Sequence, residues 1–570
     1  MIVANTTPDS SGQGKGLFHS HNRRGLLFCM VFVLGAVLYG YDGTYFTGIL
    51  AMTRFKDDFG TLQNGVRVIT ASNQSLFASI VQVGEVLGSL GAGFIGDRSG
   101  RKGALFMVVV IVTIGAVLQL IVVGSTPLLV VGRLVLGAGV GIASNCVPLY
   151  LAEIPPAAIR GAMVSSWQLF LAIGQVIGAV VAQGTKDVQS TFSWRFPIAF
   201  NMVITLLIAF GLLFVPESPR WLISKDRPED AQRALERIHK KNDDIIVQDQ
   251  VDAMVNAREA ERLSSGGESR ALERIHKKND DIIVQDQVDA MVNAREAERL
   301  SSGGESRWAD VFKGTQRRRF LCAFGILVCQ QISGVQFIFS YATVFFESIG
   351  QTDAFLMTII VDILEVAGVL VSFFLVNRFG RRPLLLNTMV VMAATLVICG
   401  ALGIIRDRST AMNTVIASMI MIYVFVFNLA WGPLAWVVAT ELATGKNRTK
   451  IMSVGTGAFW VAAWAVTFTL PYLYNPDSAN LGPMVCWIYF GGAVISWLFV
   501  YFMIPETLGR SLEEINMMLE REVPTREWKN YKINSEEFTS GGEFDSAEKK
   551  GKGDGQIEHL DSSTGSATSV

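Results

Sequence analysis

Charged residues are scarce in this sequence. Asp, Glu, Lys and Arg together make up only 17% of its 570 residues, and the formal net charge is −1. A chain without a basic excess is not expected to bind nucleic acid. The sequence also lacks a placed nucleophile–base set and a phosphate-binding loop, so we expect no enzyme activity and no cofactor.

Cysteine is rare as well, with six residues in the whole chain. All six lie within apolar stretches, where a thiol packs as a small hydrophobic side chain. This placement favours packing over a disulfide framework or a metal site. The six residues are Cys29, Cys146, Cys322, Cys329, Cys399 and Cys486.

Apolar residues, by contrast, are abundant: half of the chain is hydrophobic and the mean hydropathy is +0.37. They form twelve blocks, each close to the ~20 residues that cross ~30 Å of hydrocarbon as a helix. The sequence therefore predicts an all-α polytopic membrane protein with twelve transmembrane helices. No cleavable signal peptide is apparent before the first block. The blocks are 26–48, 72–95, 103–124, 127–150, 162–184, 196–215, 320–346, 353–376, 383–404, 414–438, 452–473 and 483–504.

Lysine and arginine concentrate in alternate loops. The richer set comprises Arg23, Arg24, Arg98, Arg101, Lys102, Arg160, Arg378, Arg381, Arg382, Lys446, Arg448 and Lys450. The sparser set comprises Arg54, Lys56, Arg67, Lys186, Arg195, Arg406 and Arg408. Because positive charge favours the cytoplasmic side, we expect both termini in the cytoplasm.

The chain divides into two halves, 26–215 and 320–504, between a tail at 1–25, a polar linker at 216–319 and a tail at 505–570. Three short motifs occur at matched places in both halves. GDRSGRK (96–102) matches NRFGRRP (377–383), AEIPPAAIRG (152–161) matches TELATGKNRTK (440–450), and PESPRW (216–221) matches PETLGRS (505–511). The pattern predicts two parallel six-helix repeats with a site between them, as in major facilitator transporters.

These motifs resemble those of the sugar porter family of the major facilitator superfamily, over roughly residues 25–225 and 308–515, and GYDGTYFTGIL is similar to fungal members. The resemblance implies a monomeric plasma-membrane carrier that imports a sugar with protons by alternating access. The sugar would be a hexose, or a disaccharide such as sucrose. A facilitative uniporter and a sugar receptor with the same fold remain alternatives.

The linker contains a 37-residue segment, RALERIHKKNDDIIVQDQVDAMVNAREAERLSSGGES, that occurs identically at 233–269 and 270–306. Two identical copies do not make a solenoid. A longer exposed linker costs little, because loop-closure entropy grows only logarithmically with length. We therefore expect no new function from the duplication. The final stretch, 522–570, has the composition of a disordered tail.

Asp42 lies inside the first apolar block, where an unpaired carboxylate would be costly. It lies about six residues from the outer end of that block, and Arg133 lies about six residues into the fourth block. At 1.5 Å per residue, both are ~9 Å below the outer surface and can pair. The pair could be structural or a proton site. The resemblance supports the proton site, because family members that are proton symporters carry Asp in a matching GYD.

Glu85 precedes Asp97 of the first matched motif by twelve residues, and Glu365 precedes Asn377 by the same twelve, so the two acids occupy equivalent positions. Asp362 lies one turn before Glu365. No role for these acids follows from the resemblance. A protonated or hydrogen-bonded carboxyl is the plainer interpretation.

A sugar needs bidentate amides and an aromatic platform. Glutamines within apolar spans are too costly to face lipid, and they serve either as sugar ligands or as hydrogen-bond links between helices. The resemblance favours sugar binding, with Trp436 as the stacking residue. The family pattern QQxxGxN ends here in Gln336, and Phe459 precedes Trp460 where relatives are polar. The candidate residues are Gln168, Gln175, Gln330, Gln331, Gln336, Asn428 and Trp436.

The matched motifs also predict a network of charges at the cytoplasmic side. We expect their acidic side chains and arginines to exchange ion pairs, although solvated surface charge is the alternative. The candidate gate residues are Asp97, Arg98, Arg101, Glu153, Arg160, Glu217, Arg378, Arg381, Glu441, Arg448 and Glu506.

Overall fold

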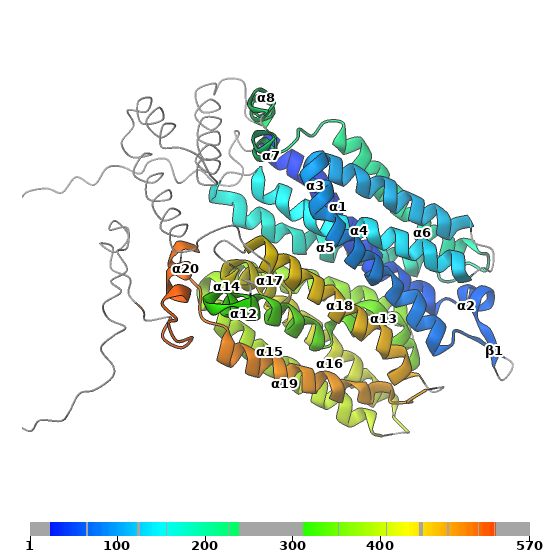
Figure 1. Ribbon diagram of the computed structural model, residues 1–570. Helices are drawn as coiled ribbons and strands as arrows, with labels where there is room; N and C mark the ends of the chain where they lie inside the picture. Colours follow the sequence, from blue (N-terminus) through cyan, green and yellow to red (C-terminus); the bar gives the residue numbers. More distant parts are fainter. Residues whose placement is uncertain are drawn as a thin grey trace, which may run out of the picture. The chain divides into compact units, whose positions relative to one another are not determined.

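A computed structural model of the chain shows a bundle of long helices (Figure 1). It describes residues 23–63, 66–121, 126–154, 157–225, 227–238, 312–351, 353–405, 407–443, 448–475, 478–510, 512–528 and 531. Residues 239–306 of the duplicated linker segment and the tail from 532 onward lie outside these residues, so the expectations about them stay predictions. The first residues of the predicted disordered tail are described, and Val523 and Trp528 among them are buried, at 4% and 0% exposed.

Twelve membrane spans occur among the described residues. Eleven segments are long and apolar enough to cross a membrane. One of them, α3 (Ala71–Ile121), holds two spans, because its helix is interrupted at Gly100, where φ is 80°. The other unbroken spans are α1 (Arg23–Ala51), α4 (Thr126–Glu153), α5 (Ala157–Thr185), α6 (Phe192–Leu212), α14 (Ala354–Phe379), α15 (Arg381–Gly403), α18 (Arg448–Tyr474) and α19 (Cys486–Met503), the last preceded by the short helix η2 (Gly482–Val485).

Two spans that the sequence predicted as single blocks are broken helices. The first consists of α12 (Gly314–Ile332) and α13 (Val335–Ser348), with Gly334 between them at φ 100°. The second consists of α16 (Thr410–Leu429) and α17 (Trp431–Leu442), with Ala430 in a non-helical conformation. Inside a membrane, non-helical backbone must be satisfied by protein groups. Gln330 does this, because its Nε2 donates to the carbonyl oxygens of Trp431 and Gly432 at 2.8 and 3.1 Å.

Short elements mark the two ends of the bundle (Figure 1). The helices α7 (Pro219–Ser224), α8 (Pro228–Ile238) and α20 (Leu512–Glu520) lie at the end that carries GDRSGRK and NRFGRRP, which we call the motif end. At the other end, the opposite end, lie α2 (Thr53–Phe59) and the antiparallel strands β1 (Thr61–Gln63) and β2 (Val66–Val68), with Leu62 paired to Arg67.

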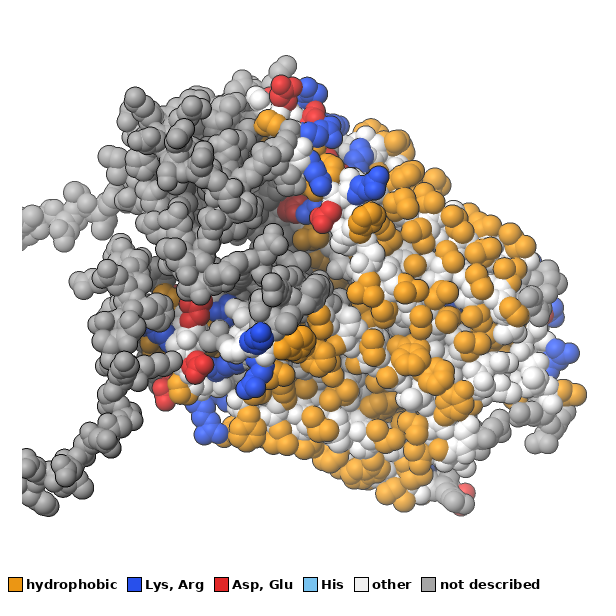
Figure 2. Space-filling view, viewed as in Figure 1, with side chains coloured by type: hydrophobic (Ala, Val, Ile, Leu, Met, Phe, Trp, Pro, Cys, Tyr) orange, Lys and Arg blue, Asp and Glu red, His pale blue; other side chains and the backbone are white. Residues whose placement is uncertain are grey.

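The flank of the bundle is apolar. Figure 2 shows hydrophobic side chains over the visible flank and charged side chains gathered at the ends. Leu206, Phe210 and Phe374 are 70%, 63% and 80% exposed. Such a surface is unsuited to water and suited to lipid. Together with the twelve spans, it confirms the predicted polytopic membrane protein.

Three helix pairs make most of the contact between the two halves: α18 packs on α3, α14 packs on α5, and α13 packs on α1, and α17 touches α5 as well. Each pair joins one helix from the first half to one from the second. Functional side chains on the facing surfaces of these helices can therefore meet at the centre. The six cysteines are buried free thiols elsewhere in the packing.

Candidate functional site

Asp42 and Arg133 form a buried ion pair. Nη1 of Arg133 lies 3.1 Å from Oδ1 of Asp42, and both side chains are 2% exposed. The same Nη1 donates to the hydroxyl oxygen of Tyr45 at 3.3 Å, and the guanidinium carbon lies 3.9 Å from the centre of the Phe46 ring. Asp42 and Arg133, which the sequence predicted to lie at one depth and to pair, are thus in contact. The surrounding aromatic rings exclude water, so each charge is neutralised mainly by the other member of the pair.

Glu85 belongs to the same charged cluster. It is 4% exposed on α3, and the charges of Asp42 and Arg133 both act on it. Tyr39 lies one turn before Asp42 on α1, and the carboxylates of Glu85, Asp42 and Glu365 all act on its hydroxyl. Tyr39 is therefore electrostatically linked to acids from both halves.

Gln175 and Glu365 connect the two halves at mid-bundle. Both are buried, Gln175 on α5 and Glu365 on α14. With its amide nitrogen turned toward the acid, Gln175 donates to both carboxylate oxygens at 2.9 and 2.8 Å. Gln175, a predicted sugar ligand, is thus hydrogen-bonded to Glu365, an acid to which the sequence assigned no role. Gln168, seven residues before Gln175 on α5, is only part-buried.

Several buried polar atoms in the second half have no partner among the described residues. They include Oε1 of Gln331, Oε1 of Gln330, Oδ1 of Asn428 and Nε1 of Trp460. Buried polar atoms are normally hydrogen-bonded, so unpaired ones near helix breaks indicate a place for a polar ligand or water. Gln330 uses its amide nitrogen to hold the second helix break, which gives it a structural task as well.

Gln336 lies in a polar row that crosses between the halves. Its Nε2 donates to Ser340 Oγ at 3.2 Å, and Ser340 Oγ lies 3.3 Å from Thr467 Oγ1. Gln82 of α3 contacts the same Thr467 hydroxyl at 3.1 Å. The Gln that replaces the family's Asn is therefore part of a chain of hydroxyls and amides leading toward the opposite end.

An aromatic wall accompanies these amides. The Tyr39 and Trp167 rings are stacked with centroids 5.9 Å apart, and Tyr39 meets Trp460 edge-on at 5.8 Å. Phe459 lies 5.0 Å from Trp460 and 5.1 Å from Trp436. The predicted platform residue Trp436 is thus one member of a larger group drawn from both halves. Aromatic faces of this kind suit the apolar face of a sugar ring.

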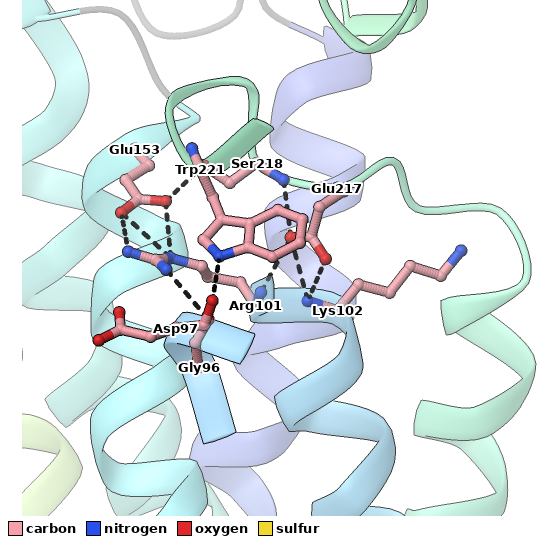
Figure 3. A network of polar contacts seen from close by, with 8 residues as sticks. All are labelled: Gly96, Asp97, Arg101, Lys102, Glu153, Glu217, Ser218 and Trp221. Carbon is pink, nitrogen blue, oxygen red and sulfur yellow. Dashed lines mark hydrogen bonds and ion pairs between the residues drawn. The ribbon is translucent and has the colours of Figure 1, made fainter. Parts of the chain in front are cut away.

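At the motif end, the first half contains a compact polar network, the first latch (Figure 3). Arg101 donates to Glu153, with Nη2 2.8 Å from Oε1, and Ser218 Oγ donates to the other oxygen of Glu153. Glu217 accepts from the backbone N–H groups of Arg101 and Lys102 at 2.9 and 3.1 Å. Three sequence-distant motifs are thereby tied together.

The second half repeats this arrangement as the second latch. Arg381 pairs with Glu441 at 3.0 Å, and Thr507 Oγ1 donates to the other oxygen of Glu441 at 2.6 Å. Glu506 accepts from the backbone N–H groups of Arg381 and Arg382, each at 3.0 Å. The chemistry repeats at equivalent positions, as expected of two structural repeats.

The latches correct the expected roles of Glu217 and Glu506. They were expected to exchange ion pairs, yet the described contacts are to backbone N–H groups. The reason is the preceding glycine: Gly100 and Gly380 have φ of 80° and 87°, and a Cβ on either would overlap the carboxylate. The following helix therefore presents free N–H groups to the acid. Burial raises the pKa of Glu217, although N–H groups of Ser218, Lys102 and Arg101 favour its charged form.

The remaining gate candidates behave differently. Asp97, Arg98 and Arg378 are exposed, and none of them forms an ion pair within the described part of the chain. The Asp97 backbone carbonyl accepts from Trp221 Nε1 at 3.1 Å. These three fit the solvated-charge alternative in this conformation. The side chains of Arg160 and Arg448 lie outside the description.

At the opposite end, polar contacts join the two halves. Lys56 pairs with Glu347 at 2.7 Å. Lys186 pairs with Asp353 at 2.8 Å. Asn475 Nδ2 donates to Gln74 Oε1 at 2.7 Å, and Ser75 Oγ donates to the Phe468 carbonyl. Every one of these contacts links a residue before 240 to a residue after 310.

Sequence reasoning missed several of these residues. Ser218 and Thr507 could have been found, because a hydroxyl residue follows near Glu217 and Glu506 in both PESPRW and PETLGRS. Tyr39 and Trp167 carried no motif that distinguishes them from packing aromatics. The contacts at the opposite end could not be predicted, because none of their residues belongs to a matched motif.

Comparisons with known proteins agree with this architecture. The profile of the sugar (and other) transporter family matches residues 28–268 and 262–519. The major facilitator-type transporter ecdD of Aspergillus rugulosus is 31% identical over 503 residues, which cover 85% of each chain. The probable glucose transporter rco-3 of Neurospora crassa is 30% identical over 502 residues, covering 85% of this chain and 78% of that one.

A yeast relative and a solved structure extend the likeness. A low-affinity glucose transporter of Saccharomyces cerevisiae is 28% identical over 507 residues, covering 87% of this chain and 81% of the relative. The partially occluded inward open structure of the xylose transporter XylE from E. coli superposes with a TM-score of 0.66 at 23% identity, covering 86% of this chain and all of XylE. The structural likeness confirms the major facilitator fold.

Proposed function

Because this chain belongs to the sugar (and other) transporter family, we propose that it imports a hexose together with protons by alternating access. The observation that carries this proposal is the ion pair between Asp42 and Arg133, each 2% exposed. A buried pair of this kind is costly to form, and a task that needs one partner to change its charge explains its presence.

The sugar would bind between the halves. We assign its hydroxyls to the amides of Gln168, Gln175, Gln330, Gln331 and Gln336, with Asn428 nearby. The support is the set of unpaired buried oxygens on Gln330, Gln331 and Asn428. Trp436 and the aromatic wall would receive the apolar face of the ring. Each hydroxyl bond is worth about 0.5–1.5 kcal/mol, so several amides together give a useful but reversible affinity.

Proton coupling would run through Asp42. When Asp42 binds a proton from outside, its attraction for Arg133 is lost, and the guanidinium is free to turn to other acceptors. Glu85, Tyr45 and the carbonyl of Phe77, which accepts from Arg133 Nε at 3.4 Å, are the acceptors at hand. Packing between α1 and α4 then differs between the two protonation states. That difference couples the proton to the conformational change.

We propose that the chain spans the plasma membrane with its motif end on the cytoplasmic side, because the excess of Lys and Arg lies at that end. Both termini would then be cytoplasmic. The contacts between halves at the opposite end would close the outer entrance, and the two latches would hold the inner ends of each half together as rigid bodies. Rocking of the halves about the central site then exposes it to one side at a time.

The test is uptake in cells that lack their own sugar carriers. Labelled glucose should accumulate against its gradient, glucose addition should make the outer medium more alkaline, and a protonophore should abolish both. Uptake without accumulation would instead indicate a facilitative uniporter. Signalling that depends on residues 522–570 without any uptake would indicate a receptor. A competition panel of hexoses, pentoses and sucrose against labelled glucose defines the preferred sugar.

A further inference from the structure

Glu365 is a buried carboxyl that the mechanism above leaves without a task. It is 0% exposed in the middle of α14, and its two oxygens face the amide of Gln175 on the other half. Asp362, one turn earlier, is 3% exposed, and its Oδ2 has no partner among the described residues. Two buried acids on one membrane helix are costly unless they bind protons or serve a function.

Among the described residues, no arginine or lysine forms an ion pair with Glu365. Arg133 pairs with Asp42, and Lys186, at the opposite end, pairs with Asp353. Within the described part of the chain, Asp362 is the charged group that acts on Glu365, and Glu365 in turn acts on Tyr39 of α1. A charged Glu365 therefore depends on the two hydrogen bonds from Gln175.

The elements packed against α14 are α5, α13, α15, α16 and α17. Tyr341 of α13 and Tyr423 of α16 direct their hydroxyls to the carbonyls of Thr467 and Ser333, each at 2.9 Å. The other charged or titratable groups on α14 and these elements lie toward the helix ends or in the apolar packing. They are Arg160 of α5, whose side chain is not described, Lys186 just beyond α5, Glu347 of α13, Asp353 at the N-cap of α14, Arg378 of α14, Arg381, Arg382 and Cys399 of α15, and Glu441 of α17.

A primary amide can hold a carboxyl group in either protonation state. Its N–H groups donate to a carboxylate, and its oxygen accepts from a protonated carboxyl. The contact between Gln175 and Glu365 therefore survives protonation if the amide turns over. Conversely, a ligand that takes the N–H groups of Gln175 leaves Glu365 as a buried carboxylate without donors. Such a group takes up a proton instead of remaining charged.

We propose that Glu365 is a second proton-binding group, which takes up a proton when the sugar engages Gln175. The inference rests on the proposed function, in which Gln175 is a sugar ligand. In the empty site, Gln175 donates to the carboxylate of Glu365. A sugar hydroxyl then accepts from the amide, and Glu365 receives a proton from water. The neutral carboxyl can donate to the amide oxygen. Release of the sugar reverses each step, and no covalent bond to carbon changes.

This arrangement places one proton site in each half, Asp42 in the first and Glu365 in the second. Asp362 is not a third site. Its buried Oδ2 has no donor among the described residues, which corresponds to a carboxyl that stays neutral in both states. Two protons would then move with each sugar, and together they drive sugar import more strongly than a single proton does.

The experiment measures protons taken up per bound glucose by the purified full chain in weakly buffered detergent solution. A pH indicator reports proton uptake, and equilibrium dialysis of labelled glucose reports binding. We expect Glu365→Gln to take up one proton fewer per glucose than the wild type. Asp362→Asn, the matched acid-to-amide change one turn away, should take up the wild-type number. Gln175→Ala should also take up one fewer, because its Glu365 is already protonated before glucose binds.

The outcomes separate this inference from the proposed function. If wild-type protein binds glucose with no proton uptake, the symport proposal fails and this inference fails with it. If the wild type takes up protons and both Glu365→Gln and Gln175→Ala take up the same number, only the assignment to Glu365 is wrong. Loss of a proton in Asp362→Asn also overturns it. Should Glu365→Gln not fold, Gln175→Ala decides alone.

Discussion

At the opposite end of the bundle, polar contacts cross from one six-helix half to the other, whereas the contacts of the described residues at the motif end stay within a half. Lys56 and Lys186 reach across to Glu347 and Asp353. Arg101 and Arg381 instead bind Glu153 and Glu441 of their own halves. This difference indicates that the contacts at the opposite end must break for the site to open there. The two latches can persist through that change.

The crossing contacts have the larger mechanical consequence. Linking Lys56→Cys to Glu347→Cys with a short reducible bifunctional thiol reagent should abolish uptake completely, because the opposite end can then no longer open. Reduction of the linker should restore uptake. Each single-cysteine variant treated with the same reagent is the matched control and should keep its activity, since the six native cysteines are buried. Undiminished uptake by the linked protein would show that this end does not gate the site.

The latches should affect stability more than gating. Among the described residues, Arg101→Ala leaves Glu153 with the Ser218 hydroxyl as its partner, and Arg381→Ala leaves Glu441 with the Thr507 hydroxyl. We expect each change to cost about 1–3 kcal/mol, the range for removing one partner of a part-buried polar contact. Because the latches lie in different halves, the two costs should add in the double variant. Thermal unfolding of the purified proteins measures this, and a strongly non-additive double variant would mean that the latches touch each other.

The smallest effect is expected from the part-exposed pair of Lys186 and Asp353, whose side chains are 20% and 32% exposed. Part burial disfavours the charge on Asp353, but hydrogen bonds from Lys186, the Leu356 N–H and Gln183 outweigh it and lower its pKa. The pair is therefore fully formed above the ordinary Asp pKa of about 4 and is lost as the pH falls through the lowered value.

Exchanging the two charges tests this pair directly. Exposed pairs contribute about 0–1 kcal/mol, so Lys186→Asp should change the uptake rate by no more than a few-fold, and less at high salt. Adding Asp353→Lys should restore the rate. If the exchanged pair remains as impaired as the single variant, the attraction between these residues does not contribute to closing the opposite end.

Much of the fold could be predicted, because membrane thickness fixes the length of each apolar block. The same rise per residue placed Asp42 and Arg133 at one depth, and the structure brings them into contact at 3.1 Å. The matched motifs predicted two equivalent networks, and both latches are present. These features were predictable because the constant rise of a helix and the equivalence of the two repeats relate a residue's number to its place in the bundle.

Other features depend on tertiary contacts that sequence spacing does not encode. Gly432 and Pro433 weaken the helix in the apolar block 414–438. They do not identify Ala430 as the non-helical residue, or Gln330 of another helix as the group that stabilises the break. The acceptor roles of Glu217 and Glu506 follow from the left-handed glycines that precede each helix. The contact between Gln175 and Glu365 requires knowing which faces of α5 and α14 meet.

The central claim is that the charge on Asp42 couples the proton gradient to sugar movement. The most direct measurement compares Asp42→Asn with the wild type in two assays on the same vesicles: glucose accumulation driven by an imposed pH gradient, and glucose exchange at equal pH. The account predicts that accumulation disappears, because the asparagine cannot titrate, while exchange continues. Accumulation at the wild-type level in Asp42→Asn would contradict the account and remove Asp42 from the coupling mechanism.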